Sequence, residues 1–146
     1  MPAVSPEQRV ILLVEDQEAD VVLIKRALEN SGVSYPVQSV PGGMEALAYL
    51  SGDPPFHDRI RYPLPVLLLL DIRMPTVNGF EVLRWVRHHP EFARLPVAVL
   101  TGSAEIEDAN RAYKLGANSF MVKPFDFGNS AELCRTVERL IAQKRP

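Results

Sequence analysis

The most regular feature of this chain is a series of short apolar runs, each followed by polar residues. Val66–Leu70 consists of five apolar residues between Pro65 and Asp71, too short for a helix and typical of a strand buried on both faces of a parallel sheet. Val10–Val14 has the same character and precedes two acidic residues. Three further strands are predicted at Val37–Val40, Pro96–Leu100 and Ser119–Val122.

Between these runs, apolar residues recur every three or four positions, as on a helix that buries one face. The predicted helices are Gln17–Asn30, Gly43–Leu50, Gly79–His88, Glu105–Leu115 and Asn129–Gln143. Their predicted inward-facing residues are Leu23, Ile24, Ala27, Leu28, Ala46, Leu47, Leu50, Phe80, Val82, Leu83, Val86, Ile106, Ala109, Ala112, Leu115, Leu133, Val137, Leu140 and Ile141. Strand and helix alternate five times, which predicts an α/β fold with helices on both faces of a parallel sheet.

Signals for the helix starts are also present. Asp16 can cap the first predicted helix, whose dipole also suits Glu18 and Asp20, and Asn78 can cap the third. Asp20 lies one turn after Asp16, so it can also support an acidic site, although complementarity to the helix dipole is the simpler explanation. The fourth predicted helix has the thinnest apolar face, and we expect it to be the most weakly held.

The connection Ser51–Pro65 is long and irregular. Its four prolines forbid a helix, and Arg59 and Arg61 make it polar. Fifteen residues are many for a connection in a compact α/β unit, and such loops are often functional. A tolerated surface insertion is the simpler interpretation.

The composition fits an ordinary globular domain of 146 residues. We expect residues 1–8, which are polar and hold two prolines, to be a flexible lead-in, and residues 9–146 to form a single domain. The formal net charge of -2 gives no argument for a nucleic acid or an anionic membrane as partner. Cys134 is the single cysteine, and no membrane-length apolar segment or signal-peptide pattern occurs, so we expect a cytoplasmic protein.

Four of the predicted strands lead into residues that can carry chemistry. These residues are Glu15 and Asp16, Asp71, Thr101 and Lys123. Because parallel strands end at one edge of a sheet, where ligands bind in open α/β folds, we expect these side chains to lie together.

The chemistry of this set points to phosphoryl transfer. Three carboxylates in one pocket repel one another unless a cation is present, and Mg²⁺ prefers oxygen ligands, so Glu15, Asp16 and Asp71 suggest an incomplete Mg²⁺ (or Mn²⁺) site. Asp71 can act as a nucleophile toward phosphorus. Thr101 can donate to a phosphoryl oxygen, and Lys123 can neutralise its charge.

These residues resemble the receiver domain of two-component response regulators over nearly the whole chain. The matching features are Glu15-Asp16, Asp71 with Met74-Pro75 and Gly79, Thr101, and Lys123-Pro124-Phe125. The separations of 30 residues from Asp71 to Thr101 and 22 from Thr101 to Lys123 also fit. The long loop 51–65 is similar to that of small stand-alone regulators, including those partnered with bacterial phytochromes.

The resemblance implies a flavodoxin-like (βα)5 sheet of strand order 2-1-3-4-5. It implies that Asp71 accepts a phosphoryl group from a sensor histidine kinase or phosphotransfer protein in a phosphorelay. It implies a metal bound by Glu15, Asp16, Asp71 and the backbone carbonyl of Arg73. It also implies a cis Lys123–Pro124 bond, and a phosphate lifetime set by the Arg73 side chain and Ser103.

Several residues depart from the commonest family pattern. Glu15 stands where Asp is frequent, and either can hold Mg²⁺ through water. Asn78 replaces a frequent Asp before Gly79, and Phe120 occupies the position of an aromatic switch residue, although ordinary core packing explains Phe120 equally well.

Three functions remain open from these residues. The first is a receiver that is no independent enzyme, catalyses only its own phosphorylation and slow dephosphorylation, and signals through phosphorylation-dependent protein contacts. The second is a constitutive adaptor of the same fold, against which the intact Asp71, Thr101 and Lys123 argue. The third is a Mg²⁺-dependent phosphatase, for which the chain offers no cap domain.

The output is expected at the face made by the helix 105–115, the strand 119–122 and the helix 129–143. A phosphoryl group on Asp71 would draw Thr101 toward it, and Phe120 would turn inward to fill the space behind the strand. The face carries mixed charges, which suit a self-complementary contact, so we expect a homodimer there. These charges are Glu105, Asp108, Arg111, Lys114, Glu132, Arg135, Glu138 and Arg139.

Overall fold

The computed structural model describes residues 9–102, 105–123 and 131–144. Its elements are β1 (Val10–Val14), α1 (Glu18–Asn30), β2 (Val37–Val40), α2 (Gly43–Ser51), β3 (Pro65–Leu70), α3 (Gly79–His88), the 3-10 turn η1 (Pro90–Phe92), β4 (Val97–Thr101), α4 (Ile106–Lys114), β5 (Ser119–Val122) and α5 (Ala131–Lys144). The expected lead-in 1–8, Ser103, the Lys123–Pro124 bond and Asn129 lie outside the described residues.

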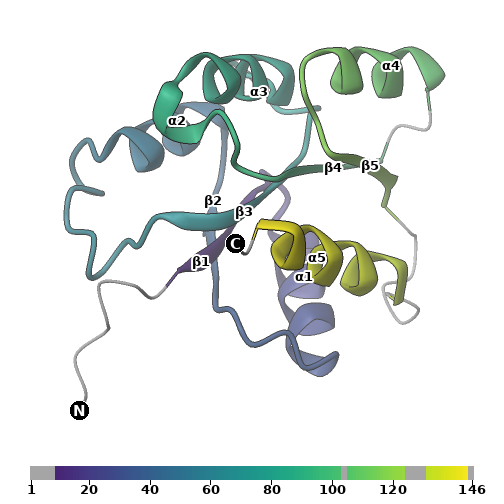
Figure 1. Ribbon diagram of the computed structural model, residues 1–146, viewed down its shortest axis with the longest axis horizontal. Helices are drawn as coiled ribbons and strands as arrows, with labels where there is room; N and C mark the ends of the chain where they lie inside the picture. The colour runs from purple at the N-terminus through teal and green to yellow at the C-terminus, as the bar shows by residue number, and fades with distance from the viewer. Residues whose placement is uncertain (1–8, 103–104, 124–130, 145–146) are drawn as a thin grey trace.

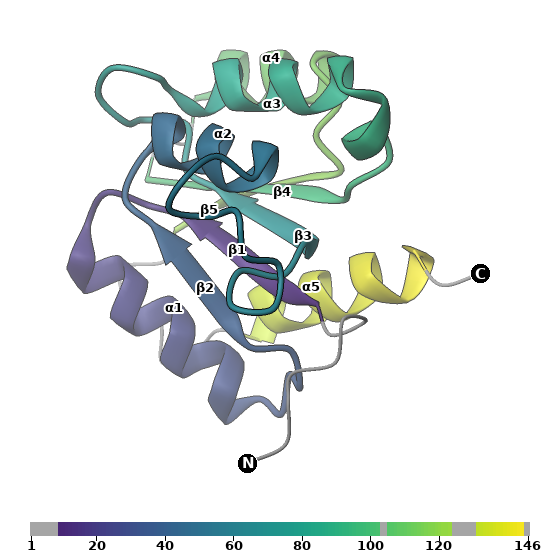
Figure 2. The ribbon, with the colours of Figure 1, turned by 90° about the vertical axis from the view of Figure 1, so that its left-hand side faces the viewer.

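The strands form one parallel sheet in the order β2-β1-β3-β4-β5. Helices α1 and α5 cover one face, and α2, α3 and α4 cover the other (Figures 1 and 2). The helices on both faces of a parallel sheet were expected from the alternation of strands and helices, and the flavodoxin-like strand order that the family resemblance implies is confirmed.

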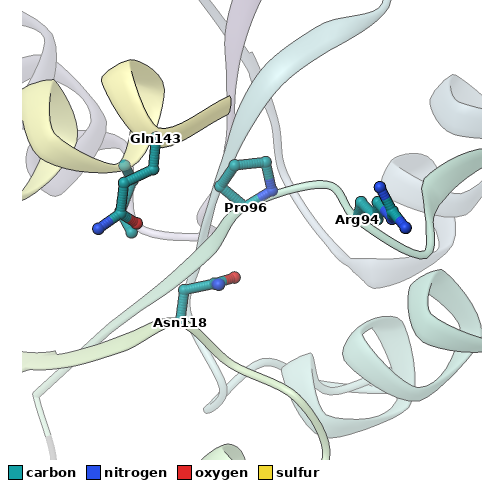
Figure 3. Close-up of a pocket in the computed structure, with 5 residues that line it drawn as sticks. Arg94, Pro96, Asn118 and Gln143 are labelled. Atoms are coloured by element: carbon teal, nitrogen blue, oxygen red, sulfur yellow. The ribbon is translucent and has the colours of Figure 1, made fainter. Parts of the chain in front are cut away.

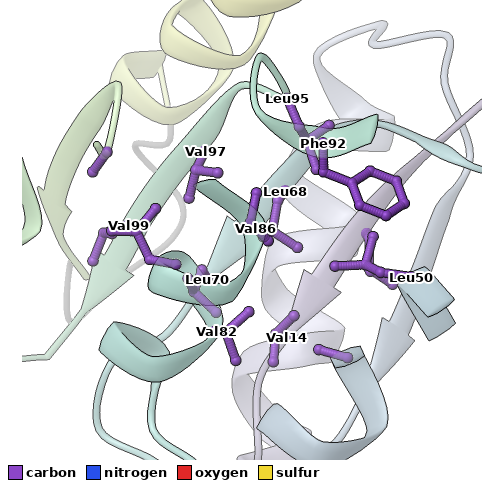
Figure 4. Packing of buried hydrophobic residues seen from close by; sticks show 14 of the residues in the cluster. Val14, Leu50, Leu68, Leu70, Val82, Val86, Phe92, Leu95, Val97 and Val99 are labelled. Atoms are coloured by element: carbon purple, nitrogen blue, oxygen red, sulfur yellow. The ribbon is translucent and has the colours of Figure 1, made fainter. Parts of the chain in front are cut away.

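The alternation of side chains along the strands gives the sheet two hydrophobic cores. On β3, Leu68 and Leu70 pack toward α2, α3 and α4, where they meet Val82 and Val86 of α3 (Figure 4). Leu67 and Leu69 of the same strand pack toward α1 and α5. Both faces of β3 are therefore buried, which explains why its sequence is continuously apolar rather than alternating.

Most element boundaries lie within one or two residues of the prediction, and Asn78 caps α3 as expected, since its side chain accepts a hydrogen bond from the Glu81 amide at 3.1 Å. The prediction that Asp16 caps α1 is wrong. Helix α1 starts one residue later, its N-cap is Gln17, and the Glu15 carboxylate accepts the Gln17 amide at 3.1 Å.

The predicted inward face of α4 is also partly wrong. Ile106 is 77% exposed, whereas Asp108, Ala112 and Ala117 are buried. Helix α4 therefore turns Asp108 inward and Ile106 toward solvent, because Asp108 forms an ion pair with Arg73 of the β3–α3 loop. A buried carboxylate at this position leaves α4 with even less apolar contact than its sequence suggested.

The long connection between α2 and β3 is packed onto the end of α2. The ring of Tyr49, which is 1% exposed, contacts Phe56 and Tyr62, and its hydroxyl donates to the Pro63 carbonyl at 2.8 Å. The guanidinium of Arg59 donates to the carbonyls of Tyr49 at 2.8 Å and Leu50 at 2.9 Å. These bonds satisfy carbonyls that the end of a helix leaves without a partner, so the loop braces α2.

Arg59→Ala tests whether these hydrogen bonds stabilise the end of α2. We expect the free energy of unfolding to fall by about 1.5–3 kcal/mol, because the substitution removes charged hydrogen bonds to partly buried carbonyls. Arg61→Ala is the matched control, since Arg61 is exposed and the contact described for its guanidinium is with the ring of Tyr62, 5.4 Å from the ring centroid. Urea unfolding measures both; equal losses in the two variants would contradict a specific role for Arg59.

Candidate functional site

The sheet itself positions the candidate site, because its hydrogen-bond ladder continues past the strand ends. The amide of Glu15 donates to the Val40 carbonyl at 3.1 Å, and the amide of Asp71 donates to the Val14 carbonyl at 3.1 Å. The amide of Lys123 donates to the carbonyl of Thr101 at 2.6 Å. The backbone of each of these residues is thus fixed by its neighbouring strand, and their side chains share the carboxyl edge of the sheet.

Three carboxylates converge on the ammonium group of Lys123. Its Nζ lies 3.1 Å from Asp71 Oδ2 and 2.9 Å from Asp20 Oδ2, and it forms a third ion pair with Glu15 Oε1. An ammonium has three N–H donors, so each donor can serve one carboxylate. The side chains of Lys123 and Asp71 are only 12% and 6% exposed, so water screens these interactions weakly.

Two pKa values reflect the charge in this cluster. Burial alone would lower the pKa of Lys123, but hydrogen bonds to Glu15 and Asp20 and the charge of Asp71 outweigh burial, and its pKa is raised. Burial raises the pKa of Glu15 to about 7; the charge of Asp71 adds to this shift, and hydrogen bonds from Lys123 and the Gln17 amide oppose it. Burial at this edge thus disfavours the charged form of Glu15, while the three carboxylates favour the charged form of Lys123.

The residues predicted to hold a metal do come together. One carboxylate oxygen from each of Glu15, Asp16 and Asp71 lies within 4.8 Å of the other two. A hard divalent cation with oxygen ligands, such as Mg²⁺ or Mn²⁺, fits this set of donors. Asp16 is the most exposed of the three, whereas Glu15 and Asp71 are buried.

The remaining predicted site residues lie on β4, β5 and the β3–α3 loop. Thr101 is fully buried at the end of β4, beside Val122 of β5. Phe120 is half-buried against the core beneath α2, α3 and α4, and its backbone amide donates to the hydroxyl of Tyr113 on α4 at 3.1 Å. The Tyr113 bond therefore connects the candidate switch residue to α4.

Arg73 connects the same edge to α4 in a second way. Its backbone amide donates to Asp71 Oδ1 at 3.0 Å, so both oxygens of Asp71 accept a hydrogen bond. Its guanidinium pairs with Asp108 and lies 3.7 Å from Glu105, both at the start of α4. The Arg73 side chain, expected to border a phosphoryl group, is thus engaged with α4 in this structure.

Sequence reasoning undervalued two carboxylates. Asp20 was assigned mainly to the helix dipole, but it contacts Lys123, and its position one turn after Asp16 was the signal that could have favoured the site. Asp108 was counted among the surface charges, but it is 8% exposed. Its spacing of four residues from the buried Ala112 places it on the inward face of the helix.

A hollow of about 330 Å³ lies at the opposite edge of the sheet, before β4 and β5 (Figure 3). Its described lining consists of Arg94, Pro96, Asn118, Leu140 and Gln143, which include no carboxylate. None of the described lining residues is one of the residues predicted to bind a metal or a phosphoryl group.

Comparison with known proteins decides the family. The family pattern described as "Response regulator receiver domain" matches residues 11–137. The chain belongs to this family. Receiver domains act in two-component signalling, and in this chain Asp71, Thr101 and Lys123 lie at the carboxyl edge of the sheet.

Similar proteins cover nearly the full length of this receiver domain. The probable methanogenesis regulatory protein FilR2 of Methanothrix harundinacea is 39% identical over 90% of this chain and 80% of its own length. Response regulator Rcp1 of Synechocystis sp. is 32% identical over 89% of this chain and 86% of its own.

Solved structures show the same fold. The phosphorylated cyanobacterial phytochrome response regulator RcpA superposes with a TM-score of 0.82 at 33% identity, covering 95% of this chain and 97% of its own. The Mn²⁺-bound form of Rcp1 gives a TM-score of 0.80 at 30% identity, covering 94% and 97%. Within the described residues, no helix of this receiver domain is long and apolar enough to span a membrane.

Gly79 is required by the close approach of α3 to the backbone that follows β3, and Gly79→Ala tests this. A Cβ at Gly79 would lie 2.5 Å from the Asp71 carbonyl oxygen and 2.6 Å from Ile72 Cα. We expect the free energy of unfolding to fall by about 1–3 kcal/mol, because backbone must move.

Gly102→Ala is the control for this variant, because no described atom lies within 4 Å of a Cβ added at Gly102, at the same edge of the sheet. We expect a change in the free energy of unfolding within about 0.5 kcal/mol there. If thermal denaturation shows Gly79→Ala to be as stable as Gly102→Ala, the inference that α3 packs closely against the Asp71 backbone is refuted.

Proposed function

We propose that this protein accepts a phosphoryl group on Asp71 from a sensor histidine kinase or phosphotransfer protein and signals through altered protein contacts. The observation that carries the proposal is the contact between the Lys123 ammonium and Asp71 Oδ2, at 3.1 Å, in a buried cluster at the carboxyl edge of the sheet. A nucleophilic carboxylate beside a fixed cation is suited to receiving a phosphoryl group, whose transfer depends mainly on positioning and charge neutralisation.

In the proposed reaction, an oxygen of Asp71 forms a new bond to phosphorus while the bond between phosphorus and the donor histidine nitrogen breaks. The histidine nitrogen keeps the electron pair of that bond, and the imidazole leaves as the neutral form because its other ring nitrogen carries a proton in the donor. Lys123 is charged and can move from the carboxylate to a phosphoryl oxygen, and Thr101, buried one strand away, can donate to another.

We assign the divalent cation of this reaction to Glu15, Asp16 and Asp71, with the Arg73 carbonyl as a further ligand. The cation would neutralise charge on the phosphoryl oxygens. The 4.8 Å limit on the spacing of the three carboxylate oxygens supports this assignment, as does the Mn²⁺ in the similar regulator Rcp1. The phosphorylated form of RcpA supports phosphorylation as the signal.

The signal would reach α4 by two connections. Movement of Thr101 toward a phosphoryl group would let Phe120 turn inward, and Phe120 is tied to α4 through the Tyr113 hydroxyl. Arg73 is tied to α4 through Asp108, so a phosphoryl group would offer its guanidinium a second anionic partner. We also propose that Arg73, with Ser103, influences phosphate lifetime.

Asp71→Asn tests the proposed function. Incubation of the wild-type protein with acetyl phosphate and Mg²⁺ is expected to add the mass of one phosphoryl group, and Asp71→Asn is expected to add none, because an amide is a poor nucleophile. Asp53→Asn, an exposed site in the α2–β3 loop, is the control and should behave as wild type.

Mass spectrometry distinguishes the alternatives to this proposal. A constitutive adaptor would show no added phosphate in any of the three proteins. Equal phosphorylation of wild type and Asp71→Asn would place the acceptor elsewhere, and turnover of acetyl phosphate without a phosphorylated protein would indicate a phosphatase.

We further propose that the protein forms a homodimer through α4, β5 and α5. Three large apolar side chains are exposed on the first two of these elements: Ile106 (77%), Tyr113 (52%) and Val122 (46%). Arg111, one of the charges expected at this contact, stacks over Phe80 of α3, 4.2 Å from the ring centroid. Burial of the apolar residues is therefore the better reason to expect association.

Val122→Lys should abolish this dimer, because it places a charge among the apolar residues. Met44→Lys is the matched control, since Met44 is 60% exposed but lies on α2. Light scattering with Mg²⁺ and a phosphoryl mimic should give a dimer mass for wild type and Met44→Lys and a monomer mass for Val122→Lys. A monomeric wild type at high concentration would refute the dimer.

A further inference from the structure

We propose that Asp20 is a positioning residue that limits how strongly Lys123 binds a phosphoryl group on Asp71. This inference rests on the proposed function and concerns the same site. Its basis is the hydrogen bond from Lys123 Nζ to Asp20 Oδ2, at 2.9 Å, since the same ammonium contacts Asp71 Oδ2 at 3.1 Å.

Asp20 differs from the other acidic residues of the site in what it can contact. The oxygens that share one small volume come from Glu15, Asp16 and Asp71, and Asp20 is outside that set. Asp20 instead approaches Lys123 from the first turn of α1. A cation bound by Glu15, Asp16 and Asp71 would leave the Asp20 carboxylate outside its ligands, so Asp20 could still accept a hydrogen bond from the Lys123 ammonium.

This arrangement sets up a competition for Lys123. Its ammonium donates to Asp20, and Asp20 also contributes a negative charge that a phosphoryl group on Asp71 must face. Like charges at this range repel, and an anion already paired with Lys123 weakens the attraction that Lys123 offers to a second anion. Removing the charge of Asp20 while keeping its shape should therefore strengthen the binding of a phosphoryl group.

Glu18 provides a matched control for this idea. Glu18 and Asp20 both lie in the first turn of α1, so each contributes one negative charge near the positive end of the helix dipole. Glu18 is exposed and is not one of the carboxylates that contact Lys123 in the described structure. Asp20→Asn and Glu18→Gln thus change the same charge and the same helix, and only Asp20→Asn changes the contact with Lys123.

The experiment measures by calorimetry the affinity for beryllofluoride, an inorganic phosphoryl mimic, at saturating Mg²⁺, together with the affinity for Mg²⁺ alone. Asp20→Asn should bind beryllofluoride about fivefold more tightly than wild type. Glu18→Gln should stay within about twofold of wild type. Asp20→Glu, which restores the carboxylate, should return toward the wild-type affinity, and Mg²⁺ affinity should be similar in Asp20→Asn and Glu18→Gln.

The outcomes separate this inference from the function on which it rests. If wild type binds beryllofluoride but Asp20→Asn matches Glu18→Gln or binds it more weakly, the role of Asp20 is refuted and the proposed function stands. If Asp20→Asn loses Mg²⁺ affinity that Glu18→Gln keeps, Asp20 acts on the cation and the inference is overturned. If wild type itself does not bind beryllofluoride in the presence of Mg²⁺, both the inference and the proposed function fail.

Discussion

The ion pairs of Lys123 are the interaction on which the site depends. Glu15, Asp20 and Asp71 would repel one another at a largely buried sheet edge, and the ammonium of Lys123 lies in contact with all three. One ammonium does not balance three carboxylates, and burial, with the neighbouring Asp71 adding to it, raises the pKa of Glu15 to about 7. A site in this condition favours the binding of a divalent cation, which would complete the neutralisation that one ammonium begins.

The sheet makes this concentration of charge possible. Glu15, Asp71 and Lys123 each continue the hydrogen-bond ladder by one residue, so their backbones are held by neighbouring strands before any side chain interacts. The apolar cores on both faces of β3 anchor that edge. By contrast, α4 is attached by little apolar surface and by polar contacts through Arg73 and Tyr113, both of which lead back to the site. A change of charge at Asp71 would therefore act first on the least firmly held helix.

Much of this structure could be predicted from the sequence because it depends on local patterns. The apolar run before Asp71 specifies a buried strand, and the spacing of apolar residues specifies the helices. The cap at Asn78 was also predictable, since a side chain of this type before Gly79 satisfies a nearby amide. The strand order came from the resemblance to a family and was confirmed by the structure.

The errors concern contacts between residues distant in sequence. Asp108 faces inward and Ile106 outward because Arg73, 35 residues earlier, supplies the partner that lets a carboxylate be buried. Asp20 reaches Lys123 over 103 residues, and its spacing from Asp16 suggests a place near the acidic site but does not identify Lys123 as its partner. The packing of the α2–β3 loop onto Tyr49 likewise depends on Arg59 reaching carbonyls at the end of a helix, which a composition rich in proline does not predict.

The central claim is that Lys123 exchanges its contact with Asp71 for a contact with a phosphoryl group carried by Asp71. A crystal structure with Mg²⁺ and beryllofluoride bound tests this most directly. The account predicts beryllium on an oxygen of Asp71, the cation among Glu15, Asp16 and Asp71, and the Lys123 ammonium on a fluoride. Beryllofluoride bound elsewhere, or a Lys123 that keeps its Asp71 contact and leaves the fluorides without it, would contradict the account.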